Sequence, residues 1–391
     1  MRGVRKILKG AIYMTVLALI PLGGLAQKDE AALNAANALL TRMTLEEKVA
    51  QLFFVRPEDF SRISSVSKPS AKLERAFERF GVGGVILFPE NMKTAKQLTQ
   101  LTGAMREYAK KQRGIDLFLG VDEEGGSVAR VAKKLRLKEP VPSMSIIGET
   151  KDSQQAYEAG RRIGGYLSEY GFTLDFAPVA DVRMDVERAE ITKRSFGYDA
   201  RLVAGMVKAF TQGLQEQGVL AVLKHFPGHG AASGNSHNGA AVSTRTLEEW
   251  RACEWLPFQE GIQAGANVVM ISHQIAATVD NAVPASLSYR IVTELLRGEM
   301  GFDGVVITDA LRMKAVSETY GSGEACVRAI EAGCDMLLLP KNFSNGYNGV
   351  MEALEEGRLT EARIDESVRR ILTLKAEWGL LEETAQTREL M

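Results

Sequence analysis

The chain has 391 residues, is 45% hydrophobic, and carries 48 lysines and arginines against 49 aspartates and glutamates. This length and apolar content allow one large globular domain or two small ones. The formal net charge of −1 favours neither nucleic acid nor an anionic membrane surface as a partner. Individual motifs must therefore indicate the activity.

The N-terminal residues have the layout of a secretory signal. A basic start is followed by an apolar stretch at 11–20 and by small residues that end at Ala26. We predict that residues 1–26 are a signal peptide, removed near Ala26–Gln27. An uncleaved membrane anchor is the alternative, but the apolar stretch is short for a membrane span. We expect export to the periplasm or the medium, without a permanent membrane anchor.

Residues 30–383 are predicted to form one α/β domain. A helix is expected over 30–43, and Thr44-Leu45-Glu46-Glu47 is typical of a capping box that opens another helix. Short apolar runs then alternate with amphipathic stretches. Eight runs are predicted strands: Gln51–Val55, Val82–Phe88, Leu117–Val121, Leu174–Val179, Val219–Leu223, Val268–Ile271, Val305–Thr308 and Met336–Leu339. The predicted helices include Thr94–Lys111, Ser153–Tyr170, Arg201–Gln217, Thr246–Ala264, Ser317–Ala332 and Glu361–Trp378.

Continuous apolar strands that alternate with helices indicate a parallel sheet covered on both sides. Eight such units predict a (β/α)8 barrel of the TIM type. A doubly wound open sheet is the alternative, and the absence of a GxGxxG after the first strand argues against it. Six polar residues lie at or just beyond the carboxyl ends of predicted strands, where a barrel collects its catalytic groups: Asp122, Asp181, Lys224, His225, His273 and Asp309.

The three cysteines, Cys253, Cys326 and Cys334, are too few for a disulfide framework. We expect mostly buried, inert thiols, and a Cys326–Cys334 bridge is left open. No CxxC pair occurs, so a thiolate zinc site has no support.

Three of the four histidines lie in one short run, from Lys224-His225-Phe226-Pro227-Gly228-His229-Gly230 to Asn235-Ser236-His237. Histidine exchanges protons most readily near neutral pH, and Gly and Pro fix the loop that presents it. A zinc site on these histidines is the alternative, but their spacing matches no common zinc pattern and Pro227 prevents a helical i,i+4 pair. We expect neither a metal nor a cofactor.

Two other segments allow more than one interpretation. On position alone, Asp309 after its apolar strand is as well explained by a helix cap as by a catalytic role. Asp122 and Arg130 enclose a Gly-Gly pair that lets the backbone approach a ligand, yet a structural Asp–Arg pair explains them equally well. Arg194, in the loop after the fourth strand, and Lys224 suit a polar substrate rich in hydroxyls.

These motifs together resemble glycoside hydrolase family 3, and in particular its bacterial β-N-acetylglucosaminidases. KHFPGHG, followed after four residues by NSH, is similar to the family pattern KH(F/I)PGHG-x4-Asp-Ser/Thr-His. GVDEEGGSVAR, DFAPVADV, RSFG, VVITDAL and AIEAGCDMLLLP resemble further family segments. The resemblance covers residues 35–380. The family's β-glucosidases usually have a Trp after the nucleophile, where this chain has Ala310.

The resemblance implies roles for individual residues. Asp309 matches the nucleophile that forms a glycosyl-enzyme intermediate, and His237 matches the general acid/base. A histidine with an ordinary pKa of about 6.5 suits both proton donation and water activation near neutral pH. The residues that match the family's sugar-binding positions are Asp122, Arg130, Arg194, Lys224 and His225.

The chain departs from the family at Asn235, where the pattern has an Asp that orients the catalytic histidine. An Asn amide can accept a hydrogen bond from the ring but contributes no negative charge, and the analogous change in a serine-protease triad costs about four powers of ten in rate.

The sequence therefore predicts a secreted, retaining exo-glycosidase that removes terminal β-linked N-acetylglucosamine from cell-wall fragments, muropeptides or chitin-type saccharides. The alternatives are a β-glucosidase of the same family and, because of Asn235, a weakly active or non-catalytic relative that binds amino sugars.

Overall fold

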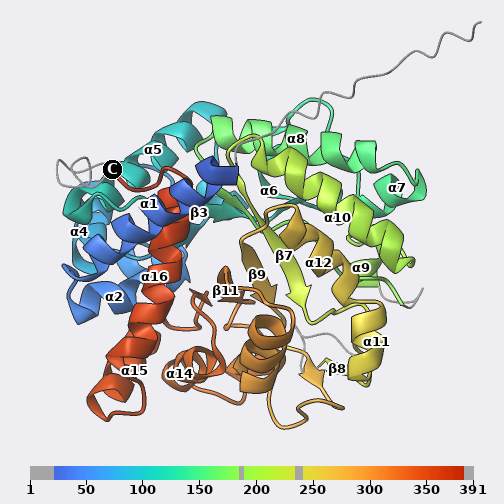
Figure 1. Cartoon of the computed structure of the whole chain (residues 1–391). Helices are drawn as coiled ribbons and strands as arrows, with labels where there is room; N and C mark the ends of the chain where they lie inside the picture. The colour runs from blue at the N-terminus through green and yellow to red at the C-terminus, as the bar shows by residue number, and fades with distance from the viewer. Residues whose placement is uncertain (1–21, 185–188, 234–240, 383–391) are drawn as a thin grey trace, which may run out of the picture.

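Eight short parallel strands form the centre of the molecule and helices surround them (Figure 1). The computed structural model describes residues 22–184, 189–233 and 241–382. The strands follow the order β11-β9-β7-β6-β3-β2-β1-β12. Their bounds are β1 Phe53–Val55, β2 Gly84–Ile86, β3 Phe118–Val121, β6 Leu174–Asp175, β7 Leu220–Phe226, β9 Val268–Ile271, β11 Val305–Thr308 and β12 Leu337–Leu338. Each predicted strand is confirmed within a few residues.

The sheet curls into a nearly closed barrel. The first strand pairs with the last, with Phe53 opposite Leu337. The two ends of the strand order, β11 and β12, are joined by a parallel bridge between Ile307 and Met336, where the Thr308 N–H donates to the Met336 carbonyl at 3.0 Å. The barrel expectation is confirmed, and the doubly wound alternative is wrong because an open sheet would leave these two edges apart.

The helices are α1 Leu22–Leu40, α2 Leu45–Gln51, α3 Pro57–Ser61, α4 Ala71–Phe80, α5 Ala95–Arg113, α6 Arg130–Leu135, α7 Met144–Glu149, α8 Ser153–Glu169, α9 Ala189–Thr192, α10 Ala200–Gln215, α11 Leu247–Ala252, α12 Trp255–Gln263, α13 Lys314–Ser317, α14 Ser322–Ala332, α15 Phe343–Glu355 and α16 Glu361–Glu377. Short 3-10 turns lie at Pro89–Asn91 (η1) and Ala285–Leu287 (η2), and a π-helix at Arg290–Glu299 (η3). The short strands β4 Glu123–Gly125 and β5 Val128–Ala129 pair with each other, as do β8 Val242–Ser243 and β10 Ile275–Ala276. Among the helices that the structure describes, none has the length and apolar character of a membrane span.

Two predicted helices are each divided in the structure. The stretch Thr246–Ala264 contains α11 and α12, because Pro257 in the first turn of α12 has no N–H to continue a helix through Cys253. Ser317–Ala332 is divided between the end of α13 and α14, whose N-cap is Gly321. The predicted capping box is confirmed: Thr44 Oγ1 accepts from the Glu47 N–H and Glu47 Oε2 accepts from the Thr44 N–H.

All three cysteines are free, so the Cys326–Cys334 bridge that the sequence left open is not formed. Cys326 and Cys334 are fully buried, and burial raises the pKa of the Cys334 thiol to about 12. Such a thiol is inert at neutral pH.

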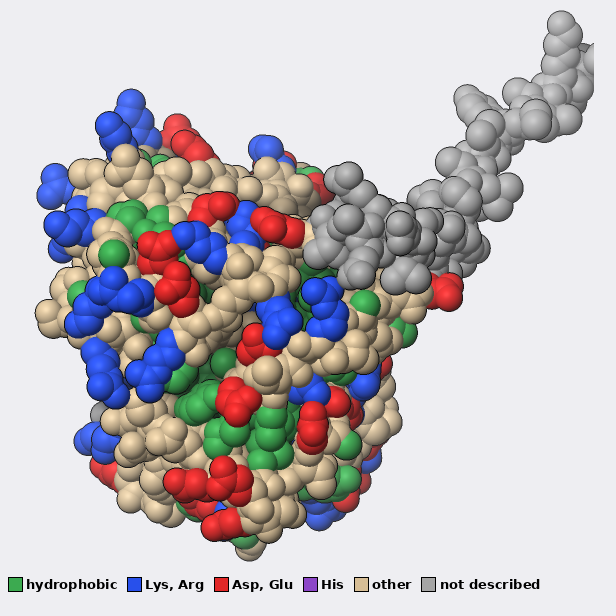
Figure 2. Space-filling view, turned by 90° about the vertical axis from the view of Figure 1, so that its left-hand side faces the viewer, with side chains coloured by type: hydrophobic (Ala, Val, Ile, Leu, Met, Phe, Trp, Pro, Cys, Tyr) green, Lys and Arg blue, Asp and Glu red, His purple; other side chains and the backbone are tan. Residues whose placement is uncertain are grey.

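Apolar side chains fill the barrel as well as the layer outside it. Phe54, Phe118 and Phe176 belong to an inner cluster that α16 joins from below through Ile371 and Leu374. A larger cluster lies between the strands and the surrounding helices. On the face shown in Figure 2, basic and acidic side chains both occur around a central group of hydrophobic ones, in keeping with the near-zero net charge.

Candidate active site

The alternation of side chains along each strand decides which polar residues face the barrel axis. Val222 and Ile307 belong to the inner cluster. Lys224 and Asp309 lie two residues beyond them, so they share the inward face at the carboxyl end of the barrel. Asp122 lies four residues beyond the inward Phe118, again an even number, so it has the same orientation. These three predicted site residues therefore converge on one end of the axis.

Lys224 is the centre of a buried charge cluster. Its Nζ lies 3.0 Å from Asp122 Oδ1 and 2.7 Å from Glu124 Oε1. Arg194 donates to both carboxylate oxygens of the same Glu124, from Nε to Oε2 and from Nη2 to Oε1, each at 2.7 Å. Burial alone would raise the pKa of Glu124, but the charges of Arg194 and Lys224 outweigh it and lower that pKa. The cluster is therefore ionised and geometrically fixed.

Glu124 is a member of the charge cluster that the sequence did not predict. It belongs to the GVDEEGGSVAR segment, but the resemblance implies no role for it. The signal is present in the sequence, because three consecutive acidic residues after a buried strand need partners if they are buried as well. Asp122 is the more open carboxylate, with 24% of its side chain exposed, and its Oδ2 has no partner among the residues described. That oxygen is available to a ligand hydroxyl.

Arg130 is the first residue of α6, which Glu123 caps by accepting from the Val131 and Ala132 N–H groups at 2.7 and 3.0 Å. The structural Asp122–Arg130 pair that the sequence allowed is not formed, because Asp122 pairs with Lys224 instead. The Arg130 Nε is buried and has no hydrogen-bond partner within the described ranges.

Asp181 organises the histidine loop. Its carboxylate accepts from His225 Nδ1 at 2.7 Å, from the His225 N–H at 3.2 Å and from the His229 N–H at 2.7 Å. Burial raises the pKa of Asp181, but His225 and His229 outweigh it, and the net shift is downward. Asp181 therefore fixes the ring of His225 and the course of the loop together. The sequence predicts Asp181 at a strand end but does not assign it to the site.

His229 is a poor proton carrier at neutral pH. Burial lowers its pKa to about 4, despite the nearby Asp181. Its Nδ1 is buried and has no hydrogen-bond partner among the described residues. His229 is therefore neutral in the folded protein.

Asp309 follows β11 and is held by the backbone on both sides. Its N–H donates to the Ile271 carbonyl at 2.8 Å, and its Oδ1 accepts from the Ala310 N–H at 2.7 Å. Burial raises the pKa of Asp309, but His273, His225 and Lys224 lower it overall. The helix-cap interpretation is wrong, because no helix begins after Asp309; α13 starts only at Lys314. Because its pKa is lowered, the carboxylate is ionised.

Two predicted site residues, His237 and Asn235, lie outside the described residues, so the structure does not place the expected acid/base. Within the described ranges, no three His, Cys, Asp or Glu side chains are grouped to hold a metal ion.

Comparisons with known proteins agree with this geometry. Residues 44–374 match the model of the glycosyl hydrolase family 3 N-terminal domain. Beta-hexosaminidase A of Pseudoalteromonas piscicida is 31% identical over 82% of this chain, which spans only 58% of that relative. Beta-hexosaminidase LpqI of Mycobacterium tuberculosis is 34% identical over 84% of this chain and 82% of its own length. The solved structure of a family 3 β-N-acetylglucosaminidase from Paenibacillus sp. superposes with a TM-score of 0.80 at 33% identity, covering 89% of this chain and 67% of that one.

Proposed function

The chain belongs to glycosyl hydrolase family 3, and from this premise we propose that it removes terminal, non-reducing β-linked N-acetylglucosamine with retention of configuration. The observation that carries the proposal is Asp309, whose ionised carboxylate accepts from the Ala310 N–H and whose own N–H is held by the Ile271 carbonyl, near the Lys224 cluster. Relatives named β-hexosaminidases support the substrate. These relatives do not favour the β-glucosidase alternative.

Retention requires two displacements at the anomeric carbon. Asp309 attacks that carbon while a proton donor protonates the leaving oxygen, and water then cleaves the glycosyl ester with the same group acting as base. Since Asp309 is ionised, it is ready for the first step. His237 is proposed as the proton donor on its resemblance to the family pattern alone.

The polar cluster is suited to hold the sugar. Asp122 Oδ2 can accept from a hydroxyl, and Lys224 Nζ can donate to one while it stays paired with Glu124. Arg130 adds a donor without a carboxylate partner in the described part of the chain. Rigid, charge-assisted contacts of this kind orient the anomeric carbon over the nucleophile.

The natural substrates that we propose are cell-wall fragments, muropeptides or chitin-type oligosaccharides. We also propose that the protein is exported to the periplasm or the medium, where it acts on them.

N-terminal sequencing of the exported protein tests the proposed export. A mature chain that begins at Gln27 supports the signal peptide, and a chain that retains residues 1–26 contradicts it.

The activity is tested with a chromogenic N-acetyl-β-glucosaminide and the matching glucoside. We expect Asp309→Asn to lower kcat by at least about 10⁴-fold, because the covalent route is removed. Asp303→Asn, at a carboxylate with 90% of its side chain exposed, is the matched control and should keep the parent rate. NMR of the first product formed should show the β-anomer. Activity that survives Asp309→Asn, or an α-anomer, contradicts the mechanism; turnover of the glucoside alone contradicts the substrate.

A further inference from the structure

His273 lies beside the proposed nucleophile but was given no role above. It is 1% exposed and follows β9 by two residues. Its Nε2 lies 3.0 Å from the Ala310 carbonyl oxygen, and its Nδ1 lies 2.7 Å from Ser286 Oγ. Both ring nitrogens are therefore bonded to protein groups, and neither is left to meet a substrate.

These two partners fix the tautomer of the ring. A carbonyl oxygen only accepts, so Nε2 carries the hydrogen and donates it to Ala310. In a neutral imidazole Nδ1 is then the acceptor, and the Ser286 hydroxyl must donate to it. The titratable groups that act on the ring are Asp309 and His225. Burial lowers the pKa of His273 more than Asp309 raises it, which agrees with a neutral ring.

Ser286 is held in place by the segment that carries His273. Its N–H donates to the Ser272 carbonyl at 3.0 Å, and the neighbouring Ala285 N–H donates to the Gln274 carbonyl at 2.8 Å. These two backbone bonds lie on either side of His273. The hydroxyl is thus presented to Nδ1 by fixed backbone, at little entropic cost.

Ala310 is the residue that connects this arrangement to the nucleophile. Its N–H donates to Asp309 Oδ1 at 2.7 Å, while its carbonyl accepts from His273. The Asp309 N–H is in turn held by the Ile271 carbonyl at 2.8 Å. Rotation of the Ala310 backbone would break the bond to the carboxylate and the bond to the ring together.

We propose that Ser286 and His273 form a chain of hydrogen bonds that positions Asp309 by holding the Ala310 backbone. In this chain His273 is fixed as the neutral Nε2–H tautomer. His273 is a positioning residue and exchanges no proton during turnover. This role rests on the proposed function of Asp309, but the tautomer itself can be observed without any substrate.

The first test is the histidine side-chain ¹⁵N spectrum of the full chain between pH 5 and 8. The sequence has only four histidines, and His273→Gln identifies the signal by its loss. We expect an Nε2–H pattern that does not titrate. Ser286→Ala should keep this tautomer, because the Ala310 carbonyl still accepts from Nε2, but should shift the Nδ1 signal, because Nδ1 loses its donor. An Nδ1–H pattern, or titration near the ordinary pKa of 6.5, overturns the proposal. Neither outcome depends on whether the parent hydrolyses N-acetylglucosaminides.

The second test separates positioning from general damage. Ser286→Ala should lower kcat by about threefold to tenfold, the usual worth of one neutral hydrogen bond, and leave the Kd for N-acetylglucosamine within about twofold. Ser272→Ala is the matched control, since the Ser272 hydroxyl is buried next to His273 but has no partner in the described part of the chain; it should change neither quantity. His273→Leu should lower kcat by about 10²-fold, and His273→Gln should recover part of it by restoring a donor to Ala310. Equal effects of Ser286→Ala and Ser272→Ala, or parallel loss of kcat and sugar affinity, overturn the proposal.

Discussion

Each end of the barrel contains a buried lysine, and the pKa values of the two lysines are shifted in opposite directions. At the carboxyl end, Lys224 is paired with Asp122 and Glu124, and these carboxylates outweigh burial and raise its pKa. At the amino end, Lys375 of α16 donates to Gln51 Oε1 at 2.9 Å and lies over the Phe118 ring. Burial there lowers the pKa of Lys375 to about 7. A direct carboxylate partner, rather than depth, decides whether a buried lysine keeps its charge.

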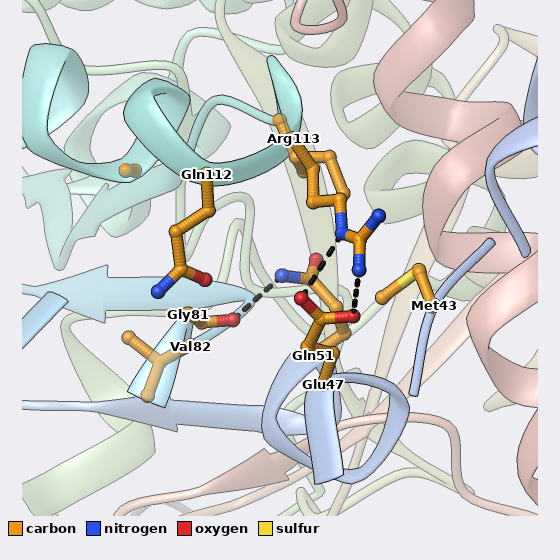
Figure 3. A pocket seen from close by; sticks show the side chains of 9 residues that line it. Met43, Glu47, Gln51, Gly81, Val82, Gln112 and Arg113 are labelled. Atoms are coloured by element: carbon orange, nitrogen blue, oxygen red, sulfur yellow. Dashed lines mark hydrogen bonds and ion pairs between the residues drawn. The ribbon is translucent and has the colours of Figure 1, made fainter. Parts of the chain in front are cut away.

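The surroundings of Gln51 show why the amino end differs. Its Nε2 donates to the Gly81 carbonyl at 2.7 Å, so its oxygen is the atom left for Lys375 (Figure 3). The nearby carboxylate of Glu47 is already paired with Arg113, which donates to its two oxygens at 3.0 and 2.8 Å (Figure 3). Likewise Asp116, the acid that acts on Lys375 from a distance, is paired with Arg106 at 2.6 Å. The charge of Lys375 is therefore left without a direct counterion among the residues described.

The largest effect is expected from Lys224→Met. It leaves Asp122 without its cation and Glu124 with Arg194 alone, so the free energy of unfolding should fall by about 3 kcal/mol. We also expect kcat/KM on an N-acetylglucosaminide to fall by about 10³-fold, because the cluster that orients the sugar is lost. Urea unfolding and steady-state kinetics measure the two effects. A stable variant with parent activity would show that the carboxyl-end cluster is neither structural nor functional.

The same substitution at the other end, Lys375→Met, should act in the opposite direction. The ordinary pKa of lysine is 10.5 and the folded value is about 7. Below pH 7 both folded and unfolded chains hold the proton, and the folded state carries the full cost of a buried charge. Between pH 7 and 10.5 the unfolded chain binds more protons, so stability of the parent rises with pH. Lys375→Met should therefore raise the free energy of unfolding by about 2 kcal/mol at pH 6 and flatten this rise.

Activity of Lys375→Met should stay within about twofold of the parent, since the site lies at the other end of the barrel. Unfolding free energies measured at pH 6, 8 and 9.5 distinguish the outcomes. A loss of stability at pH 6 would mean that Lys375 is better solvated than its burial indicates.

The smallest effect, and the most direct test of the comparison, is Gln51→Glu. It gives Lys375 the carboxylate that Lys224 already has, so the lysine should keep its charge and the pH dependence between 7 and 10.5 should shrink. The net change in stability should be within about 1 kcal/mol, because the new ion pair is offset by desolvation and by repulsion from the Gly81 carbonyl. An unchanged pH profile would show that a counterion does not decide the charge here.

The sequence predicts the inward site residues better than their partners. Strand periodicity places Asp122, Lys224 and Asp309 on one rim, and the structure agrees. It does not show that Glu124 is shared by Lys224 and Arg194, because that pairing joins three separate loops and strand ends. Lys375 is indistinguishable in sequence from a solvent-facing lysine on an amphipathic helix. Its burial depends on how the end of α16 packs beneath the barrel, and no local pattern encodes that contact.

The pairing of β1 with β12 has a consequence for how the chain acquires its structure. Strand β1 has both of its neighbours only after Phe53 has paired with Leu337, which lies far along the chain. In the same way, α1 packs against α16, near the end of the described chain. Contacts so distant in sequence are slow to form, because a long loop must close before they stabilise anything. A growing chain on the ribosome therefore cannot complete the barrel until almost all of it has been synthesised. Such a delay would be compatible with the export that we propose, because a chain must be unfolded to pass through a translocation channel.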